Sequence, residues 1–399
     1  MMPIRDLNTL IPPFTFHGRS CNFSLLGFVS TPRLEERSMR KSIAAVAVVA
    51  AASMAVVGLA PAASAADGVA TAKAIVAKYS KNPTSLGNIP VIGKPIPKNK
   101  YVIAITNQTD AAITLNKFQV QAGKLLGWKM ESIQAEATIE GQRKVLSDAI
   151  AKKPNGIAVS GMEPESYGDL YKKAAAQGTA VICSACLAAP GNGLVDSHVA
   201  GPKMLDLWGQ MIAAFAVANV KGTPDVQAFG LSVYPVLVRY DTSFKKNLLK
   251  LSPKAKYAFT ELDFSPGQIG NAYKANPTTN FISSDLGDFA LGWPQQLFTV
   301  GAIPGQKPLI GGLTAGKAAI QALKDKTENA WTAYSLPIVG YSVIDSFARL
   351  WTNTPFAKAD LPTQILTQKN IGTAVLDADG NYVGVKDYVA QFKKIWGLK

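Results

Sequence analysis

The chain of 399 residues carries a formal net charge of +14 at pH 7. Its lysines are scattered, without the dense basic and aromatic stripe that is typical of nucleic-acid binders, so we expect a solvated surface and no nucleic-acid partner. Only two histidines are present, His17 and His198, which leaves little room for a histidine-based metal site or a Ser-His-Asp triad. We expect no metal centre and no cofactor.

Residues 39–65 have the three-part layout of an export signal. Arg40 and Lys41 provide a cationic start, residues 43–60 form an apolar centre, and Ala63-Ser64-Ala65 is a small-residue cleavage site. A retained membrane anchor is the alternative, because the apolar run is close to spanning length. Its alanine-rich composition and its small-residue end favour cleavage. We therefore expect an exported protein of the bacterial periplasm or cell envelope.

The segments on either side of this signal do not resemble folded domains. Residues 1–38 contain several prolines and would bury the start of the signal, so we interpret them as an unfolded upstream extension, with translation beginning at Met39. Residues 66–100 form an N-terminal preamble, with a short helical stretch followed by prolines that forbid a long helix.

From residue 101 the hydrophobic pattern alternates between strands and helices. The first series predicts strands at 101–106, 129–135, 156–160 and 179–183, and helices at 114–126, 139–152, 165–177 and 203–220. The second series predicts strands at 226–231, 255–262, 280–284, 307–313 and 330–335, and helices at 240–251, 268–275, 289–300, 316–324 and 339–351.

Strands that are separated by helices of this length form parallel sheets covered on both faces. We therefore predict an α/β protein with two doubly wound parallel-sheet lobes, a hinge and a cleft between the lobes. The predicted boundaries are 101–220 for the N-terminal lobe, 221–330 for the C-terminal lobe, and 331–399 for the hinge return, closing helices and C-terminal tail. Ligands of open parallel sheets bind beyond the carboxyl ends of the strands, so the loops there should line the cleft.

Several short segments resemble the sugar-type (type I) periplasmic binding proteins of ABC importers, and in particular the ribose-binding group. The resemblance covers about residues 101–351 and rests on the order and spacing of segments at 105–108, 153–159, 177–182, 197–200, 263–265 and 281–285. Residues 388–399 are similar to the C-terminal helix of actinobacterial members.

The resemblance implies a set of pocket residues at the strand ends. In the first lobe these are Asn107, Gln108 and Thr109 after the first strand and Cys183 and Ser184 at the fourth, where the family typically has an Asp-Arg pair. In the second lobe the implied residues are Arg239, Phe264, Ser284, Asp285, Leu313 and Tyr334, with Trp293 as a further wall residue.

At some of these positions the chain has a less polar residue than the family has. Phe264 matches a stacking aromatic, but Leu313 replaces a pocket aspartate and Tyr334 replaces a glutamine. Because a buried sugar needs a partner for every hydroxyl, these replacements favour a more apolar or aromatic ligand.

Cys183 and Cys186 are the only cysteines after the predicted signal. An exported protein can form a disulfide here, which would stiffen a pocket loop; free thiols and a redox function are the alternatives. A Cys183 and His198 pair of nucleophile and base is a further alternative, since the two residues would supply hydrolase chemistry if the fold brought them together.

Together these features predict a binding protein and not an enzyme. We expect a monomer that captures a small molecule in the cleft and delivers it to an ABC permease and its ATPase, with membrane contact only through the permease. A sensory binding protein for a receptor kinase is the alternative, and an exported cysteine-dependent hydrolase is less favoured.

Processing at the predicted site gives the first testable outcome. Mature protein from the envelope fraction should begin at Ala66 or Asp67, because cleavage follows the small-residue site. Intact-mass measurement and N-terminal sequencing check this. Recovery of the envelope protein with residues 1–65 attached would contradict both the processing and the export.

Overall fold

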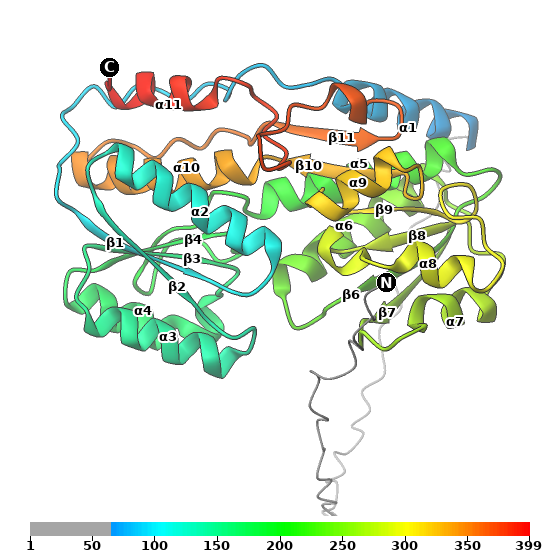
Figure 1. Cartoon of the computed structure of the whole chain (residues 1–399), viewed down its shortest axis with the longest axis horizontal. Helices are drawn as coiled ribbons and strands as arrows, with labels where there is room; N and C mark the ends of the chain where they lie inside the picture. The colour runs from blue at the N-terminus through cyan, green and yellow to red at the C-terminus, as the bar shows by residue number, and fades with distance from the viewer. Residues whose placement is uncertain (1–64) are drawn as a thin grey trace, which may run out of the picture. The chain divides into compact units, whose positions relative to one another are not determined.

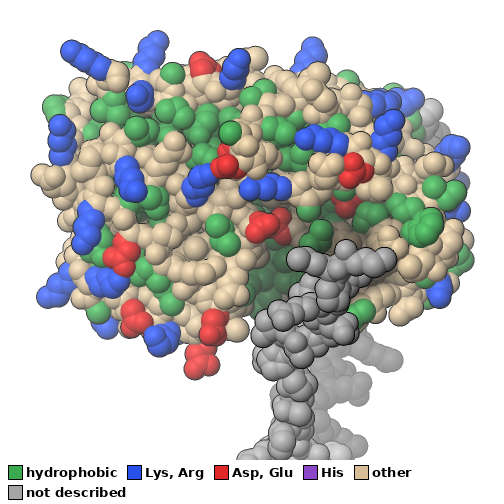
Figure 2. Space-filling view, viewed as in Figure 1, with side chains coloured by type: hydrophobic (Ala, Val, Ile, Leu, Met, Phe, Trp, Pro, Cys, Tyr) green, Lys and Arg blue, Asp and Glu red, His purple; other side chains and the backbone are tan. Residues whose placement is uncertain are grey.

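The computed structural model describes residues 65–399 (Figure 1). The predicted extension at 1–38 and nearly all of the predicted signal at 39–65 lie outside this range. Among the helices at 65–399, none has the length and apolar character needed to cross a membrane. Figure 2 shows lysines and arginines spread over the visible face without a continuous basic stripe.

The first sheet consists of parallel strands in the order β2-β1-β3-β4-β5. The strands are β1 (Tyr101–Thr106), β2 (Lys129–Gln134), β3 (Gly156–Ser160), β4 (Ala180–Ser184) and β5 (Leu194–Asp196). The helices between them are α2 (Asp110–Leu125), α3 (Ile139–Ala151) and α4 (Pro164–Ala176), of which α3 and α4 lie side by side on one face (Figure 1). Central strands β1 and β3 are buried on both faces, as their continuous apolar runs predict.

The second sheet has the order β11-β10-β9-β8-β6-β7. Its parallel strands are β6 (Asp225–Gly230), β7 (Lys256–Glu261), β8 (Phe281–Ser284), β9 (Leu309–Gly312) and β10 (Ala330–Tyr334). They alternate with α6 (Pro235–Leu251), α7 (Gln268–Ala275), the short helices η1 (Gly287–Ala290) and α8 (Trp293–Phe298), and α9 (Lys317–Lys324). Strand β11 (Thr363–Thr367) is antiparallel to β10 and was not predicted. The predicted fold class of two doubly wound lobes is confirmed.

Two long helices pack against the lobe opposite to the strands that they follow in the chain. Helix α5 (Pro202–Asn219) follows the first sheet but packs mainly on α6 and also contacts β9 and β10. Helix α10 (Leu336–Thr352) follows the second sheet but packs on α2 and β4. Both helices are apolar on most of their circumference, as helices buried in a core must be. The predicted lobe boundaries at 220 and 330 follow chain order, and packing crosses them; they remain a proposal.

The preamble and the C-terminal segment lie over these crossing helices. Helix α1 (Ala65–Tyr79) packs on α5 and α6, and the following segment contributes buried Leu86 and Ile92 to the core. The amide of Ile92 donates to the carbonyl of Ile395 in α11 (Tyr388–Trp396), at 2.9 Å. The ring of Trp396 in α11 stacks on Tyr341 of α10 with centroids 5.7 Å apart.

A buried ion pair connects these segments to α10. Arg349 is 1% exposed, and its Nε donates to Asp345 at 2.6 Å. The same guanidinium donates to the carbonyls of Pro90 (2.6 Å) and Pro355 (3.2 Å), while Trp396 Nε1 donates to the other oxygen of Asp345 at 2.9 Å. Burial raises the pKa of Asp345, and the charge and hydrogen bonds of Arg349 oppose that rise. The pair is therefore stabilised by a complete set of partners.

Removing Arg349 should destabilise the protein strongly. Arg349→Ala leaves Asp345 buried without its cation, and such losses cost about 3–5 kcal/mol of unfolding free energy. Urea unfolding of the mature protein measures the change. Arg143→Ala is the matched control, because its ion pair with Asp169 lies at the surface and should contribute little. Similar midpoints for the two variants would contradict a stabilising role for Arg349.

Candidate functional site

A cavity of about 760 Å³ lies at the carboxyl edge of the first sheet; the second lobe forms one of its walls, and the cavity stays partly open to solvent. Its first-lobe walls come from the loops after β2, β3 and β4 and from the first turns of α3 and α4, and its second-lobe wall is the turn after β6. The lining residues are Ala137, Thr138, Ile139, Gln142, Gly161, Glu163, Glu165, Ser166, Tyr167, Leu187, Ala188, Val233, Tyr234 and Pro235. This is the position at which parallel sheets bind ligands, and the volume suits a small molecule.

Two tyrosines from different lobes face this cavity. Tyr167 in α4 is buried, and its hydroxyl donates to Gln142 Oε1 of α3 at 2.5 Å. Tyr234 caps α6, and its hydroxyl donates to the carbonyl of Ala137 across the cavity at 3.4 Å. Burial raises the pKa of both tyrosines, and the proximity of Tyr234 raises that of Tyr167 further. Both phenols therefore stay neutral and serve as hydrogen-bonding groups with an aromatic face.

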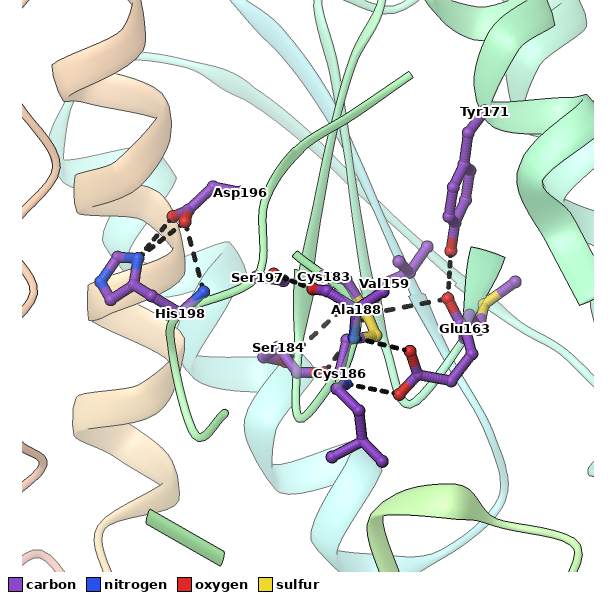
Figure 3. The surroundings of a disulfide bond; sticks show 12 residues. Val159, Glu163, Tyr171, Cys183, Ser184, Cys186, Ala188, Asp196, Ser197 and His198 are labelled. Atoms are coloured by element: carbon purple, nitrogen blue, oxygen red, sulfur yellow. Dashed lines mark hydrogen bonds and ion pairs between the residues drawn. A yellow bond between two sulfur atoms is a disulfide. The ribbon is translucent and has the colours of Figure 1, made fainter. Parts of the chain in front are cut away.

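The loop after β4, residues 185–188, is held from two sides (Figure 3). Cys183 and Cys186 are joined in a disulfide, with Cα atoms 5.9 Å apart. The buried Glu163 carboxylate accepts from the amides of Leu187 (2.6 Å) and Ala188 (3.1 Å). Burial raises the pKa of Glu163, whereas these two hydrogen bonds act in the opposite direction. This part of the cavity wall is consequently fixed before any ligand arrives.

A second contact between the lobes lies near the start of α2. The carboxylate of Asp288 in η1 accepts from the amide of Ala111 at 3.1 Å, and Thr109 caps the same helix by accepting from Ala112. Burial is the main cause of the raised pKa of Asp288. In addition, Lys117 of α2 forms an ion pair with Asp379. The bonds from Ala111 and Tyr234 join the two lobes across the cleft, whereas the ion pair of Lys117 connects α2 with the C-terminal segment.

The residues predicted from the resemblance lie elsewhere, because none of them is among the residues that line the 760 Å³ cavity. In the first lobe, Asn107 accepts from the amide and hydroxyl of Thr109, forming a turn that leads into α2. Gln108 is exposed on that turn. The Ser184 hydroxyl is buried and donates to the carbonyl of Val159 at 3.4 Å.

The second-lobe residues are divided between the core and the surface. Ser284, Asp285 and Leu313 are buried, and Trp293 packs against Phe229 in the core. Tyr334 stacks on Trp208 with centroids 4.0 Å apart. In contrast, Phe264 is 59% exposed and meets Phe289 edge to face. Arg239 is held by Asp206 in a two-pronged ion pair (3.0 and 2.6 Å) that lines a separate, more exposed hollow along α5 and α6.

The arrangement of Cys183 and His198 does not supply the hydrolase chemistry. The Cys183 sulfur is in the disulfide, and His198 Nδ1 lies 2.8 Å from both oxygens of Asp196 (Figure 3). A disulfide sulfur is not a thiolate nucleophile. The nucleophile and base interpretation was therefore wrong for this structure.

Gln142, Tyr167 and Tyr234 line the cavity but are not among the residues predicted from the sequence. Tyr234 follows β6 directly, so the rule that strand-end loops line the cleft could have identified it. Gln142 and Tyr167 lie inside helices, where their pattern is that of ordinary buried residues.

The disulfide can be tested directly on native protein. Protein prepared without reductant should weigh two hydrogens less than reduced protein and should resist alkylation at both cysteines, because the bonded sulfurs carry no thiol. Intact-mass spectrometry with and without reductant measures both properties. Free alkylation of Cys183 and Cys186 in unreduced protein would refute the bond.

No protein-family model and no curated protein matches the chain. The fold, in contrast, is similar to many solved structures. A solute-binding protein of an ABC transporter from Agrobacterium vitis, solved with alpha-D-tagatopyranose, aligns with a TM-score of 0.61 at 18% identity, over 72% of this chain and 100% of that chain. A periplasmic ribose ABC transporter protein from Conexibacter woesei aligns with a TM-score of 0.58 at 15% identity, over 70% and 96%. At these identities the likeness concerns the fold, and this chain has the fold of the sugar-type, type I periplasmic binding proteins.

Proposed function

We propose that this protein is the solute-binding component of an ABC importer and that it captures its ligand in the 760 Å³ cavity. The observation that carries the proposal is the composition of the cavity wall, which combines strand-end loops of the first lobe with the turn after β6 of the second. Solved structures of similar fold include solute-binding proteins of ABC transporters, several of them with a bound sugar or polyol. A site shared by two lobes that can separate suits reversible capture rather than catalysis.

Ligand binding would act by favouring the closed arrangement. The bonds from Tyr234 to Ala137 and from Ala111 to Asp288 exist only when the lobes are together. A ligand that contacts Tyr167 on one lobe and Tyr234 on the other gains both contacts only in that state, so it shifts the population toward closure. The closed protein would then deliver the ligand to a permease driven by its ATPase. This role requires export, which the predicted signal at 39–65 would provide.

The cavity chemistry disfavours an anionic ligand, because two glutamates, Glu163 and Glu165, are among the lining residues, and it favours a ligand with a flat apolar face. Its lining residues, all within the described part of the chain, include no lysine or arginine that could neutralise an anion. Tyr167, Tyr234, Ile139 and Val233 offer rings and apolar surface, whereas Gln142 and Thr138 offer a few polar groups. We therefore propose a sugar-like ligand that carries an aromatic or fused-ring face and binds more tightly than a free aldose.

Binding measurements on variants test the site. A thermal-shift screen of the mature protein with sugars, nucleosides, aromatic acids and sterol fragments identifies a ligand, because a compound at 100 times its dissociation constant stabilises by about 2.7 kcal/mol. Calorimetry with that compound should then give an affinity about 30- to 1000-fold lower for Tyr234→Ala, since truncating a desolvated aromatic contact costs about 2–4 kcal/mol. Tyr234→Phe should retain most of the affinity because it retains the ring.

Two further variants separate this cavity from the site that the resemblance implies. Phe298→Ala, at an exposed aromatic outside the cavity lining, is the control and should leave the affinity unchanged. Phe264→Ala tests the stacking role predicted for Phe264. A large loss in Phe264→Ala with none in Tyr234→Ala would place the ligand away from the cavity, and sub-micromolar binding of glucose or ribose would contradict the proposed ligand class.

A further inference from the structure

The 760 Å³ cavity contains acidic side chains without basic ones. Glu163 and Glu165 belong to its lining, and none of the lining residues, all within the described part of the chain, is a lysine, an arginine or a histidine. Neither glutamate forms an ion pair with a basic residue of 65–399. A cleft lined by charges of one sign concentrates ligands of the opposite sign, so this cavity attracts a cation.

The two glutamates differ in what already holds them. Glu163 is 6% exposed, and its two oxygens accept from the amides of Leu187 and Ala188. Glu165 is exposed in the first turn of α4, where the described residues offer its carboxylate neither an ion pair nor a hydrogen bond. Burial is the main cause of the raised pKa of Glu163, and the charge of Glu165 adds to it. The two carboxylates therefore lie close enough to interact, and Glu165 is free to bind a ligand.

Arg143, which follows the lining residue Gln142 in α3, does not neutralise this charge. Its guanidinium donates to both oxygens of Asp169, at 2.9 and 2.6 Å, and to the carbonyl of Ser166. An arginine bound in this bidentate way has its charge balanced by its own partner. The negative charge at Glu165 is thus left for a ligand to balance.

The remaining lining residues suit a cation attached to a sugar-like or aromatic body. The rings of Tyr167 and Tyr234 come from opposite lobes, and the face of an aromatic ring attracts an ammonium group. Gln142 is 8% exposed and accepts from Tyr167 through Oε1, whereas its Nε2 has no partner among the described residues. That amide group can donate to a hydroxyl or carbonyl oxygen of the ligand.

We propose that the ligand carries a protonated amine, which the Glu165 carboxylate binds beside the rings of Tyr167 and Tyr234. The inference rests on the proposed function, since it concerns the ligand of the same cavity. The chemical class is an amino sugar or an amino-substituted glycoside with a flat ring. An acidic residue in the first turn also stabilises its own helix, which requires no ligand. Glu140 has that position in α3 without lining the cavity, so the two roles can be separated.

Two matched pairs of probes test the proposal by calorimetry on the mature protein. The first pair is phenyl glucoside and the same compound with its primary hydroxyl replaced by an amine. The second pair is N-acetyltryptamine and tryptamine. We expect each amine to bind about tenfold more tightly than its neutral partner, and added NaCl to reduce this preference, because a cation gains from the carboxylate and the rings and salt screens that gain.

Substitution of two glutamates identifies the group responsible. Glu165→Gln should remove the preference for the amine and leave the affinity of the neutral partner nearly unchanged. Glu140→Gln is the matched control, because Glu140 is also the second residue of its helix and its substitution changes the net charge by the same amount. This variant should keep the preference. A role in the helix dipole alone would make the two variants behave alike.

The outcomes separate this inference from the proposed function. Equal affinities for amine and neutral probes, both reduced by Tyr234→Ala, would overturn the amine and keep the cavity as the ligand site. Binding that Tyr234→Ala leaves unchanged would contradict the cavity itself. The inference also fails if neither amine binds, or if Glu140→Gln loses the preference as fully as Glu165→Gln.

Discussion

The packing of α5 and α10 against the opposite lobes is the constraint on which the rest of the structure depends. Each helix leaves the sheet it follows in the chain and completes the core of the other lobe. Neither lobe can then bury its sheet without the other half of the chain. The lobes share helices along one side, and polar contacts such as those of Asp288 and Tyr234 connect their facing ends.

The same constraint gives the terminal segments their role. Helix α1 covers α5, and α11 covers α10 through the stack of Trp396 on Tyr341. The ion pair of Asp345 and Arg349 then connects α10 with the segment around Pro90 and with α11. The N-terminal and C-terminal segments outside the two sheets thus form an outer layer on the hinge side and pack as part of the core structure.

Periodicity predicted the fold, whereas it did not predict which residues line the 760 Å³ cavity, for physical reasons. Apolar runs such as 101–106 and 281–284 identify buried parallel strands because both faces must be covered. The pattern of 203–220 shows that this helix is buried but not which sheet buries it. A strand-end position likewise does not determine where a side chain points: Tyr334 stacks on Trp208, whereas Phe264 faces solvent. Gln142 and Tyr167 line the cavity because of the way α3 and α4 pack, and a single sequence does not reveal that packing.

The disulfide and the Glu163 hydrogen bonds, which fix residues 185–188, affect the entropy of ligand binding. The disulfide and the two bonds from Glu163 order this segment during folding, so its conformational entropy is already lost in the unliganded protein. Binding at the first lobe then requires no further ordering of this wall. The entropic cost of capture falls instead on the approach of the second lobe, and the lifetime of the complex would be set by how often the hinge reopens.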